Sequence, residues 1–350
     1  MALDTFLTKV ADTLLDPFRS WERVLAALSG IPNALTDFRS KTAWVYLLAS
    51  VVLACLLYWV RRRSRQLEGD VSLTSFLFPR EVYRRRSAVV DYKYVAIDLT
   101  INSLLYTPFT AGVAWFLYKS LHPLTAHFLA FDLPGMDPLT RAILLTVATV
   151  AGADLGFFLS HYLMHRIPVL WHFHEVHHSA EVLTPVTVYR VHPVEDLVNT
   201  CVAGFLSAMG ASVYTALRGT EVTIFAIYGT NVVVFMFFFV AFQLRHSHIW
   251  LSYGPVLEHL FISPAQHQIH HSTDQKHWSK NYGFIFATWD WLFGSLYVPR
   301  QREILQYGVP GTDPQDFATV GKLYFLPFAK AARTILRRRQ APQTTLTTPG

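Results

Sequence analysis

The sequence AILLTVATVAGADLGFFLSHYLMH, residues 142–165, joins a long apolar run to two histidines. Residues 142–160 carry one charge, Asp154. A helix needs about 20 apolar residues to cross a hydrocarbon core about 30 Å thick. His161 and His165 follow four residues apart and therefore lie on one face of the same helix. The segment predicts a membrane helix that ends in a pair of metal-binding side chains.

Four further runs contain no Asp, Glu, Lys or Arg: 43–60, 99–118, 197–217 and 222–244. Across the chain 52% of residues are hydrophobic and 15% are charged, against about 25% charged in average soluble domains. We therefore predict an all-α integral membrane protein with about five transmembrane helices and a cytosolic helical cap. Cys55 and Cys201 both lie in apolar runs, which argues against a disulfide scaffold or a thiolate metal site.

The net charge of +6 reflects membrane orientation and does not indicate nucleic-acid binding. Arginines gather in the loop after the first apolar run, which is typical of a cytosolic loop. With that loop in the cytosol, the run 142–160 returns His161 to the cytosolic side. The turn 218–221 makes the last two runs a tight hairpin that returns His246 to the same side. We expect a multi-pass protein of a bacterial inner membrane whose site faces the cytosol.

Thirteen of the sixteen histidines fall between residues 161 and 271. Two boxes share the pattern HxxHH. In each box we expect the first two histidines, three apart, to point one way, while the third is rotated by about 100° and reaches a second metal. His246 is a predicted ninth ligand and His192 a tenth. His122, His127 and His172 are expected to be ordinary core or surface residues. The box ligands are His174, His177, His178, His267, His270 and His271.

Two carboxylates are predicted to support these ligands. Asp154 precedes His161 by seven residues on the same helix face, and a carboxylate within a membrane helix is costly unless it has a role. We expect it to accept an imidazole N–H and so set the tautomer of that ring. Glu195 is assigned the same supporting role.

Eight or more imidazoles imply two metal ions, because structural zinc sites usually close at four ligands. His174-Glu175-x-x-His178 also matches the H-E-x-x-H pattern of zinc metalloproteases, with Glu175 as general base. The second box has Gln268 at the corresponding position, and one zinc would leave at least five histidines unused. A metal or haem carrier without catalysis is a third hypothesis.

The three histidine groups resemble the histidine boxes of the sterol desaturase and fatty acid hydroxylase superfamily. Further similar motifs are Arg190-Val-His-Pro-Val-Glu195, Asn281-Tyr-Gly283 and Trp289-Asp-Trp-Leu-Phe-Gly294, and the resemblance covers about residues 95–300. It implies a non-haem di-iron oxidase that uses two iron ions, O₂ and external electrons to hydroxylate or desaturate a lipid C–H bond. Three residues separate His161 from His165, where acyl hydroxylases of the superfamily often have four, which favours the sterol-type branch.

The chain is predicted to have three parts, of which the resemblance covers only the middle one; the resemblance also implies partners. Residues 1–90 hold an amphipathic segment, the first membrane helix and a basic loop; 91–300 form the di-iron membrane domain; 301–350 form a basic segment and a disordered tail. Electrons are expected from a separate ferredoxin, cytochrome b5-like protein or reductase, and the substrate is a membrane lipid. Residues expected to line its pocket or to anchor at the interface are Trp171, Phe173, Trp289, Trp291 and Phe293.

Overall fold

The computed structural model describes residues 8, 11–67, 69–110, 112–113, 116, 119–120, 137–217, 224–240 and 242–340. Most of the predicted outer loop 119–141, with His122 and His127, lies outside the described residues. So do the predicted turn 218–221 and almost all of the predicted disordered tail. The described part is mostly helical, as expected.

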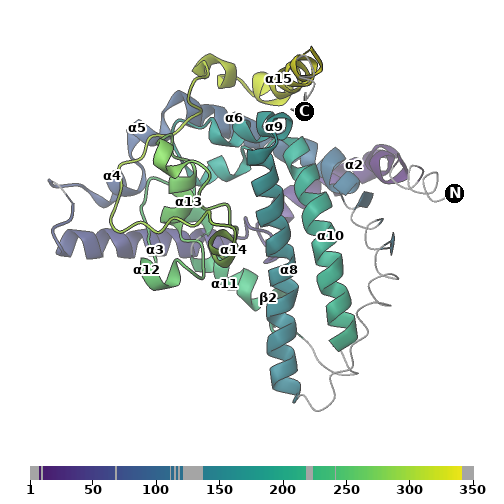
Figure 1. Cartoon of the computed structure of the whole chain (residues 1–350), viewed down its shortest axis with the longest axis horizontal. Helices are drawn as coiled ribbons and strands as arrows, with labels where there is room; N and C mark the ends of the chain where they lie inside the picture. The colour runs from purple at the N-terminus through teal and green to yellow at the C-terminus, as the bar shows by residue number, and fades with distance from the viewer. Residues whose placement is uncertain are drawn as a thin grey trace, which may run out of the picture.

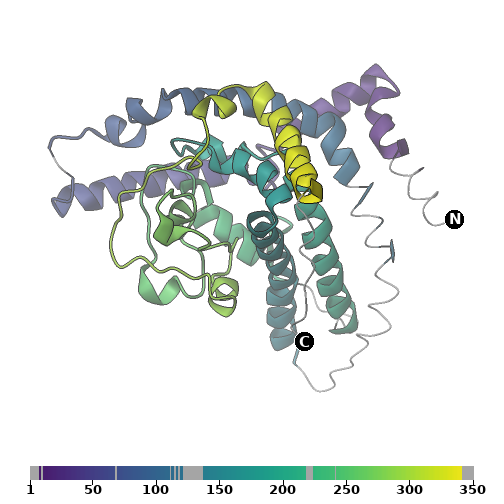
Figure 2. The same ribbon diagram turned by 45° about the horizontal axis from the view of Figure 1, so that its top comes forward.

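Two long helices, α8 (Pro138–Arg166) and α10 (Pro193–Leu217), lie side by side (Figures 1 and 2). The Asp137 side chain accepts a hydrogen bond from the Thr140 N–H, and Pro138 occupies the first turn, so α8 has a well-capped start. A Cβ added at Gly156 of α8 would lie 2.4 Å from the Cα of Ala203 in α10. Glycine is therefore required at this close approach of the two backbones.

Helix α3 (Trp44–Arg63) corresponds to the first predicted span, and in both views it runs across the direction of α8 and α10 (Figures 1 and 2). Among the described residues, α3 and α8 are the two helices that are long and apolar enough to cross a membrane. The predicted five-span topology is therefore not confirmed. The run 99–118 continues α6 (Arg86–Ile101) into a π-helical segment, η2 (Asn102–Tyr106).

The run 222–244 is not the single helix that its hydropathy predicts. Strands β1 (Ala226–Ile227) and β2 (Thr230–Asn231) form an antiparallel hairpin, and α11 (Val232–Val240) follows. Tyr228 and Gly229 both have positive φ, which is the conformation of a two-residue hairpin turn. The Asn231 side chain donates to the backbone oxygen of Thr146, so the hairpin is held against α8.

Short helices form the predicted cap around the end of α8. A longer helix, α15 (Val320–Gln340), lies over α9 (Pro168–His178) and carries Thr334, which hydrogen-bonds His172 at 2.8 Å. The cap elements are α9 (Pro168–His178), η3 (Pro185–Tyr189), η4 (Phe242–Leu244), α12 (Gly254–Leu257), α13 (Pro264–His270), η5 (Gln275–His277), α14 (Thr288–Leu292), η6 (Pro314–Phe317) and α15 (Val320–Gln340). The N-terminal part adds η1 (Asp16–Phe18), α2 (Trp21–Asn33), α4 (Leu73–Leu77) and α5 (Arg80–Tyr83).

A buried ion pair joins α6 to the cap. The Arg190 guanidinium lies 2.7 Å from the Asp91 carboxylate, and both side chains are fully buried. Arg190 also donates to the backbone oxygen of Val176 and to the Ser179 hydroxyl, at the C-terminal end of α9. Because every polar atom of a buried pair needs a partner, this network fixes the end of α9, where His177 and His178 lie.

The close approach of α8 and α10 yields a test with a matched control. Gly156→Ala should destabilise the protein by about 1–3 kcal/mol, because the added methyl overlaps the Ala203 backbone. Gly30→Ala, in α2 with nothing within 4 Å of the added Cβ, should have no effect or stabilise by up to about 1 kcal/mol. Thermal unfolding of both variants in detergent measures the difference. Equal unfolding temperatures would contradict the close packing of the two helices.

Candidate metal centre

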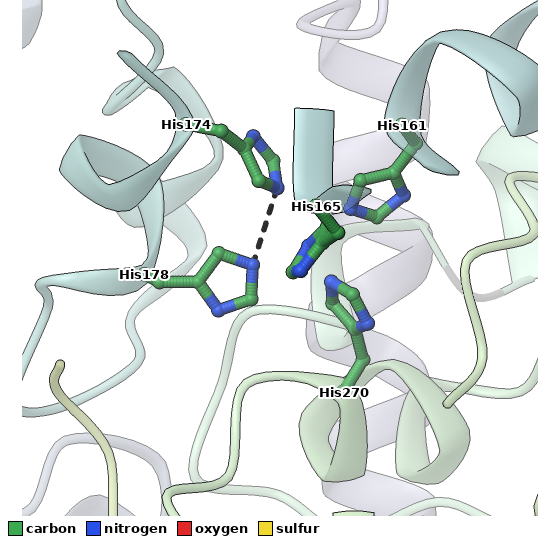
Figure 3. A group of neighbouring side chains, drawn as sticks. All are labelled: His161, His165, His174, His178 and His270. Carbon is green, nitrogen blue, oxygen red and sulfur yellow. Dashed lines mark hydrogen bonds between the residues drawn. The ribbon is translucent and has the colours of Figure 1, made fainter. Parts of the chain in front are cut away.

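Nine of the ten predicted histidine ligands come together in two groups at the end of α8. The ligand nitrogens within each group all lie within 4.8 Å of one another. Figure 3 shows the five rings of the first group pointing toward a common centre. The first group is His161, His165, His174, His178 and His270; the second is His177, His246, His267 and His271.

The five-histidine group draws on three helices. His161 and His165 come from α8, His174 and His178 from α9, and His270 from α13. The Nε2 atoms of His161, His165 and His270 are buried and have no hydrogen-bond partner among the residues that the structure describes. Buried imidazole nitrogens are normally satisfied, so three unpaired nitrogens on converging rings fit a bound cation.

The four-histidine group is centred on the Nε2 of His246. That atom lies 3.0 Å from the Nε2 of His267, 3.1 Å from that of His177 and 3.2 Å from that of His271. One ring nitrogen makes a single hydrogen bond, so three such neighbours exceed what hydrogen bonding explains. Two nitrogens bound about 2.1 Å from one metal ion, at an angle near 90–100°, lie about 3.0–3.2 Å apart. The donor set therefore fits a metal ion.

The two groups are adjacent. The histidines of each HxxHH box are distributed between them in a different way from the one predicted. The centroid of the His178 ring lies 4.5 Å from that of His271 in the other group. In each box the first and third histidines, four apart, belong together, and the middle one joins the other group. The prediction paired residues three apart. Each residue turns the helix by about 100°, so side chains four positions apart differ in direction by about 40°, and those three apart differ by about 60°. Histidines four apart therefore converge on one centre better than histidines three apart.

Backbone oxygens hold several of these rings. The Nδ1 of His161 donates to the oxygen of Tyr282 at 2.8 Å, and the Nδ1 of His270 donates to that of Lys280 at 2.8 Å. The Nδ1 of His177 donates to the oxygen of Arg190 at 3.2 Å. Donation through Nδ1 leaves Nε2 free to bind a metal and fixes the ring orientation. These carbonyls could not be found from the sequence, because any residue can supply one.

Glu195 lies beside a histidine of the five-histidine group. One carboxylate oxygen is 3.0 Å from the Nδ1 of His174, and both side chains are buried. A carboxylate beside a ligand imidazole orients the ring and strengthens its donation to a metal.

Asp154 has a different partner from the one predicted. Its carboxylate accepts hydrogen bonds from the backbone N–H groups of Ile285 and Phe286 and from the Trp289 indole, at 2.7, 3.0 and 2.9 Å. No imidazole takes part. Asp154 instead ties residues 285–289 to α8, and this segment begins just after Tyr282, whose oxygen holds His161. Its support of the histidines is therefore indirect.

Arg245 is a buried residue that sequence reasoning missed. Its guanidinium donates to the Nδ1 of His267 at 2.8 Å and to the backbone oxygens of Gly283 and Phe284. Burial lowers the pKa of Arg245 to about 10, so it remains charged at neutral pH. A guanidinium cannot accept a hydrogen bond, so the Nδ1 of His267 accepts here. Unlike in the rings held by carbonyls, the proton of this neutral ring lies on Nε2, which must lose it before that nitrogen can bind a metal. The sequence feature that could have identified Arg245 is its position between an apolar run and His246, a predicted ligand.

His192 lies outside both groups and does not supply the tenth position. Its Nε2 donates to the backbone oxygen of Tyr324 at 3.0 Å, and its Nδ1 accepts from the Val194 N–H at 3.1 Å. Both ring nitrogens are therefore already in use. The ring caps the start of α10 and packs against Phe173 and Phe328.

A cavity of about 640 Å³ reaches both histidine groups. The five aromatic residues that were expected to line the pocket or to anchor at the interface do not line this cavity. Trp171 packs against His165 and His178, while Trp291 and Phe293 are exposed, and none of the five predicted aromatic residues is in the wall. Phenylalanines from other elements line it instead: Phe157, Phe238, Phe242 and Phe284.

The Glu175 carboxylate pairs with residues outside the two histidine groups. Its carboxylate lies 3.0 Å from the Lys330 ammonium of α15 and 3.4 Å from the Nδ1 of His172. The general base of a zinc protease must face the metal-bound water. The neighbouring His174 and His178 instead share their group with three further imidazoles.

Burial keeps the cap histidines neutral. It lowers the pKa of His174 to about 3. Burial also lowers the pKa of the other six cap histidines well below the ordinary value, and the positive charges of neighbouring rings or of Arg245 add to this effect. A neutral imidazole is the form that binds metals.

Comparison with known proteins gives one family match. Residues 146–295 match the family described as Fatty acid hydroxylase. This range includes all nine clustered histidines, Asp154, Glu195 and Arg245. No solved structure gives a significant match.

Among curated proteins, the chain is similar to lipid-modifying enzymes. It is 28% identical over 165 residues to an ornithine lipid hydroxylase of Rhizobium tropici, covering 47% of this chain and 45% of that protein. It is 26% identical to an alkylglycerol monooxygenase of Caenorhabditis elegans, covering 45% and 28%. It is 28% identical to a Delta(7)-sterol 5(6)-desaturase of Aspergillus fumigatus, covering 44% and 48%. The chain thus spans less than half the length of each relative.

The Asp154 carboxylate should contribute strongly to stability. Asp154→Asn should destabilise the protein by about 2–4 kcal/mol, because an amide cannot accept all three N–H groups and turns a donor toward one of them. Trp289→Phe, which removes one donor and leaves the two backbone bonds, should have a smaller effect. Denaturant unfolding in detergent compares the two. If Asp154→Asn unfolds no more easily than Trp289→Phe, the anchoring role is refuted.

The lowered histidine pKa values predict metal binding that resists acid. A free imidazole has a pKa of about 6.5, so protons compete with metal below that pH. In the folded chain they should not compete until the pH approaches the lowered values. Between pH 7.5 and 6.0, the affinity for Co²⁺ should change less than about twofold, while that of a peptide spanning residues 168–179 should fall more than about tenfold. Competition titrations measure both, and parallel losses would disprove the buried, neutral state.

Proposed function

Since the chain belongs to the sterol desaturase and fatty acid hydroxylase superfamily, we propose that it is a membrane-bound non-haem di-iron oxidase. It uses O₂ and two external electrons to hydroxylate or desaturate a C–H bond of a sterol-like or fatty acyl lipid. Residues 91–300 form the catalytic unit. The observation that carries the proposal is the pair of adjacent histidine groups opening into one apolar cavity.

The donor set supports two iron ions, one in each histidine group. Imidazole is a suitable ligand for iron, and bound iron supplies the O₂-dependent oxidising power that side chains lack. The chain itself holds the rings in place through the carbonyls of Tyr282, Lys280 and Arg190, through Glu195 and through Arg245. Adjacent groups allow both ions to act on one substrate carbon.

The cavity supports a lipid substrate. Its wall includes Thr149 and His161 of α8, which are separated by about 18 Å along the helix at 1.5 Å per residue. Between them the wall is mostly apolar, so it can hold an extended hydrocarbon and exclude water from the reacting carbon. Lys41 and Asn199 add polar groups for a headgroup.

The reaction balances in either form. Hydroxylation consumes the C–H bond, O₂, two electrons and two protons and yields an alcohol and water. Desaturation consumes two hydrogens of the lipid with the same O₂, electrons and protons and yields an alkene and two waters. The electrons come from a separate ferredoxin, cytochrome b5-like protein or reductase. We place the active site on the cytosolic side of a multi-pass protein.

The zinc protease alternative has little support. Glu175 is paired with Lys330 of α15 and does not face the histidine groups. A second catalytic function is therefore not proposed.

Lipid analysis tests the proposed function directly. Extracts of cells with and without the gene, compared by mass spectrometry, should show a lipid that gains one oxygen atom or loses two hydrogen atoms. Under ¹⁸O₂ a hydroxylated product should carry the label. Glu175→Gln should retain this activity, whereas a protease would lose it. An unchanged lipid profile in cells that contain iron-loaded protein would refute the proposal.

Two adjacent histidines distinguish the two metal positions. His270→Ala removes a ligand of the five-histidine group, and His271→Ala removes one of the four-histidine group. Each variant should lose activity by more than about a hundredfold and retain about one of two irons. Iron per chain is measured after anaerobic purification. Wild-type protein that holds one iron or none would contradict the di-iron assignment.

A further inference from the structure

A second cavity, of about 460 Å³, lies beside the C-terminal end of α3, away from the histidine cavity. The two cavities have no lining residue in common. Three arginines line the second one, Arg61 from the end of α3 and Arg300 and Arg302 from the segment before α15. No aspartate or glutamate lines it among the described residues.

In the part of the chain that the structure describes, no carboxylate pairs with the arginines of this pocket. Among the described ion pairs, none involves Arg61, Arg300 or Arg302. The neighbouring carboxylate of Glu303 is committed elsewhere, 2.6 Å from the Lys276 ammonium and 3.1 Å from the Nε2 of His277. Like charges gathered around one concavity repel one another unless an anion lies between them.

Arg61 is held ready for such a ligand. Its guanidinium donates to the backbone oxygen of Trp250 and lies over the Phe76 ring, 5.9 Å from the centroid. A guanidinium fixed in this way loses little side-chain freedom when it binds. Arg300 and Arg302 are exposed and can close on a ligand from the other side.

The position of the pocket identifies the source of the anion. Arg61 lies in the last turn of α3, and the preceding Trp59 and Val60 are 53% and 61% exposed. An exposed apolar surface that ends in arginines is typical of the boundary between acyl chains and headgroups. A concave pocket suits a small anionic group better than the flat face of a protein.

We propose that the arginine pocket binds the phosphate of an anionic phospholipid headgroup. The planar, forked guanidinium matches the geometry of phosphate oxygens. The bound lipid would connect α3 to the segment that carries the second histidine box, because Trp250 packs against Ala265 and Ile269 of α13. This inference is independent of the proposed redox chemistry.

Binding measurements on the full chain in detergent test the proposal. The ligands are short-chain phosphatidylglycerol, short-chain phosphatidylcholine and inorganic phosphate, each at constant ionic strength. Phosphatidylglycerol should bind best, and Arg300→Ala/Arg302→Ala should weaken its binding at least tenfold. Both arginines are exposed, so this variant should fold normally. The matched control is Arg84→Ala/Arg86→Ala, which removes two exposed arginines outside the pocket and should bind like wild type.

Each outcome decides the proposal. Phosphatidylglycerol binding that depends on Arg300 and Arg302 supports a lipid headgroup. Equal or tighter binding of inorganic phosphate, with the same dependence, supports the phosphate site and identifies free phosphate as its source. Absence of binding in wild type, or equal losses in both double variants, overturns the proposal. It is also overturned if an acidic electron-transfer protein alone binds in an Arg300- and Arg302-dependent way.

Discussion

Nine imidazole rings occupy one buried volume, and the rest of the structure is arranged so that they stay there uncharged. Burying several positive rings so close together would be prohibitively costly, and burial indeed lowers the pKa of the cap histidines. Each neutral ring must then direct one nitrogen toward a shared centre and satisfy the other. The surrounding protein supplies such partners for five of the rings: backbone oxygens for His161, His177 and His270, Glu195 for His174, and Arg245 for His267.

These partners explain why the cap is built from short, tightly bonded segments. Asp154 of α8 holds residues 285–289, and Tyr282, which lies just before that segment, provides the carbonyl that accepts from His161 of α8. Arg190 repeats this arrangement for α9: its side chain is fixed by Asp91 and the end of α9, and its carbonyl accepts from His177. In both cases a buried charge fixes a loop, and the loop then fixes a ring.

The same chain shows where hydropathy misleads. Residues 222–244 have the composition of a membrane helix, yet Tyr228-Gly229 turns the backbone and the hairpin packs on α8 through Asn231. Hydropathy measures the preference of a segment for an apolar environment, which a protein interior also provides. The run 142–160, in contrast, does form one long helix, α8. No proline interrupts the run, and the C-terminal end of the helix carries the histidines and the surrounding cap.

The sequence by itself determined the mainly helical class, the superfamily and the histidines that gather at the site. Those depend on local spacing and on motifs, since residues four apart share a helix face wherever the helix lies. The tertiary structure alone decided how the rings divide into groups, that Asp154 serves a loop, that His192 caps α10, and that Arg245 holds His267. Each of these depends on a contact between segments distant in the chain, such as Asp154 with Ile285 or His192 with Tyr324. The geometry of such contacts comes from packing and leaves no periodic trace in the sequence.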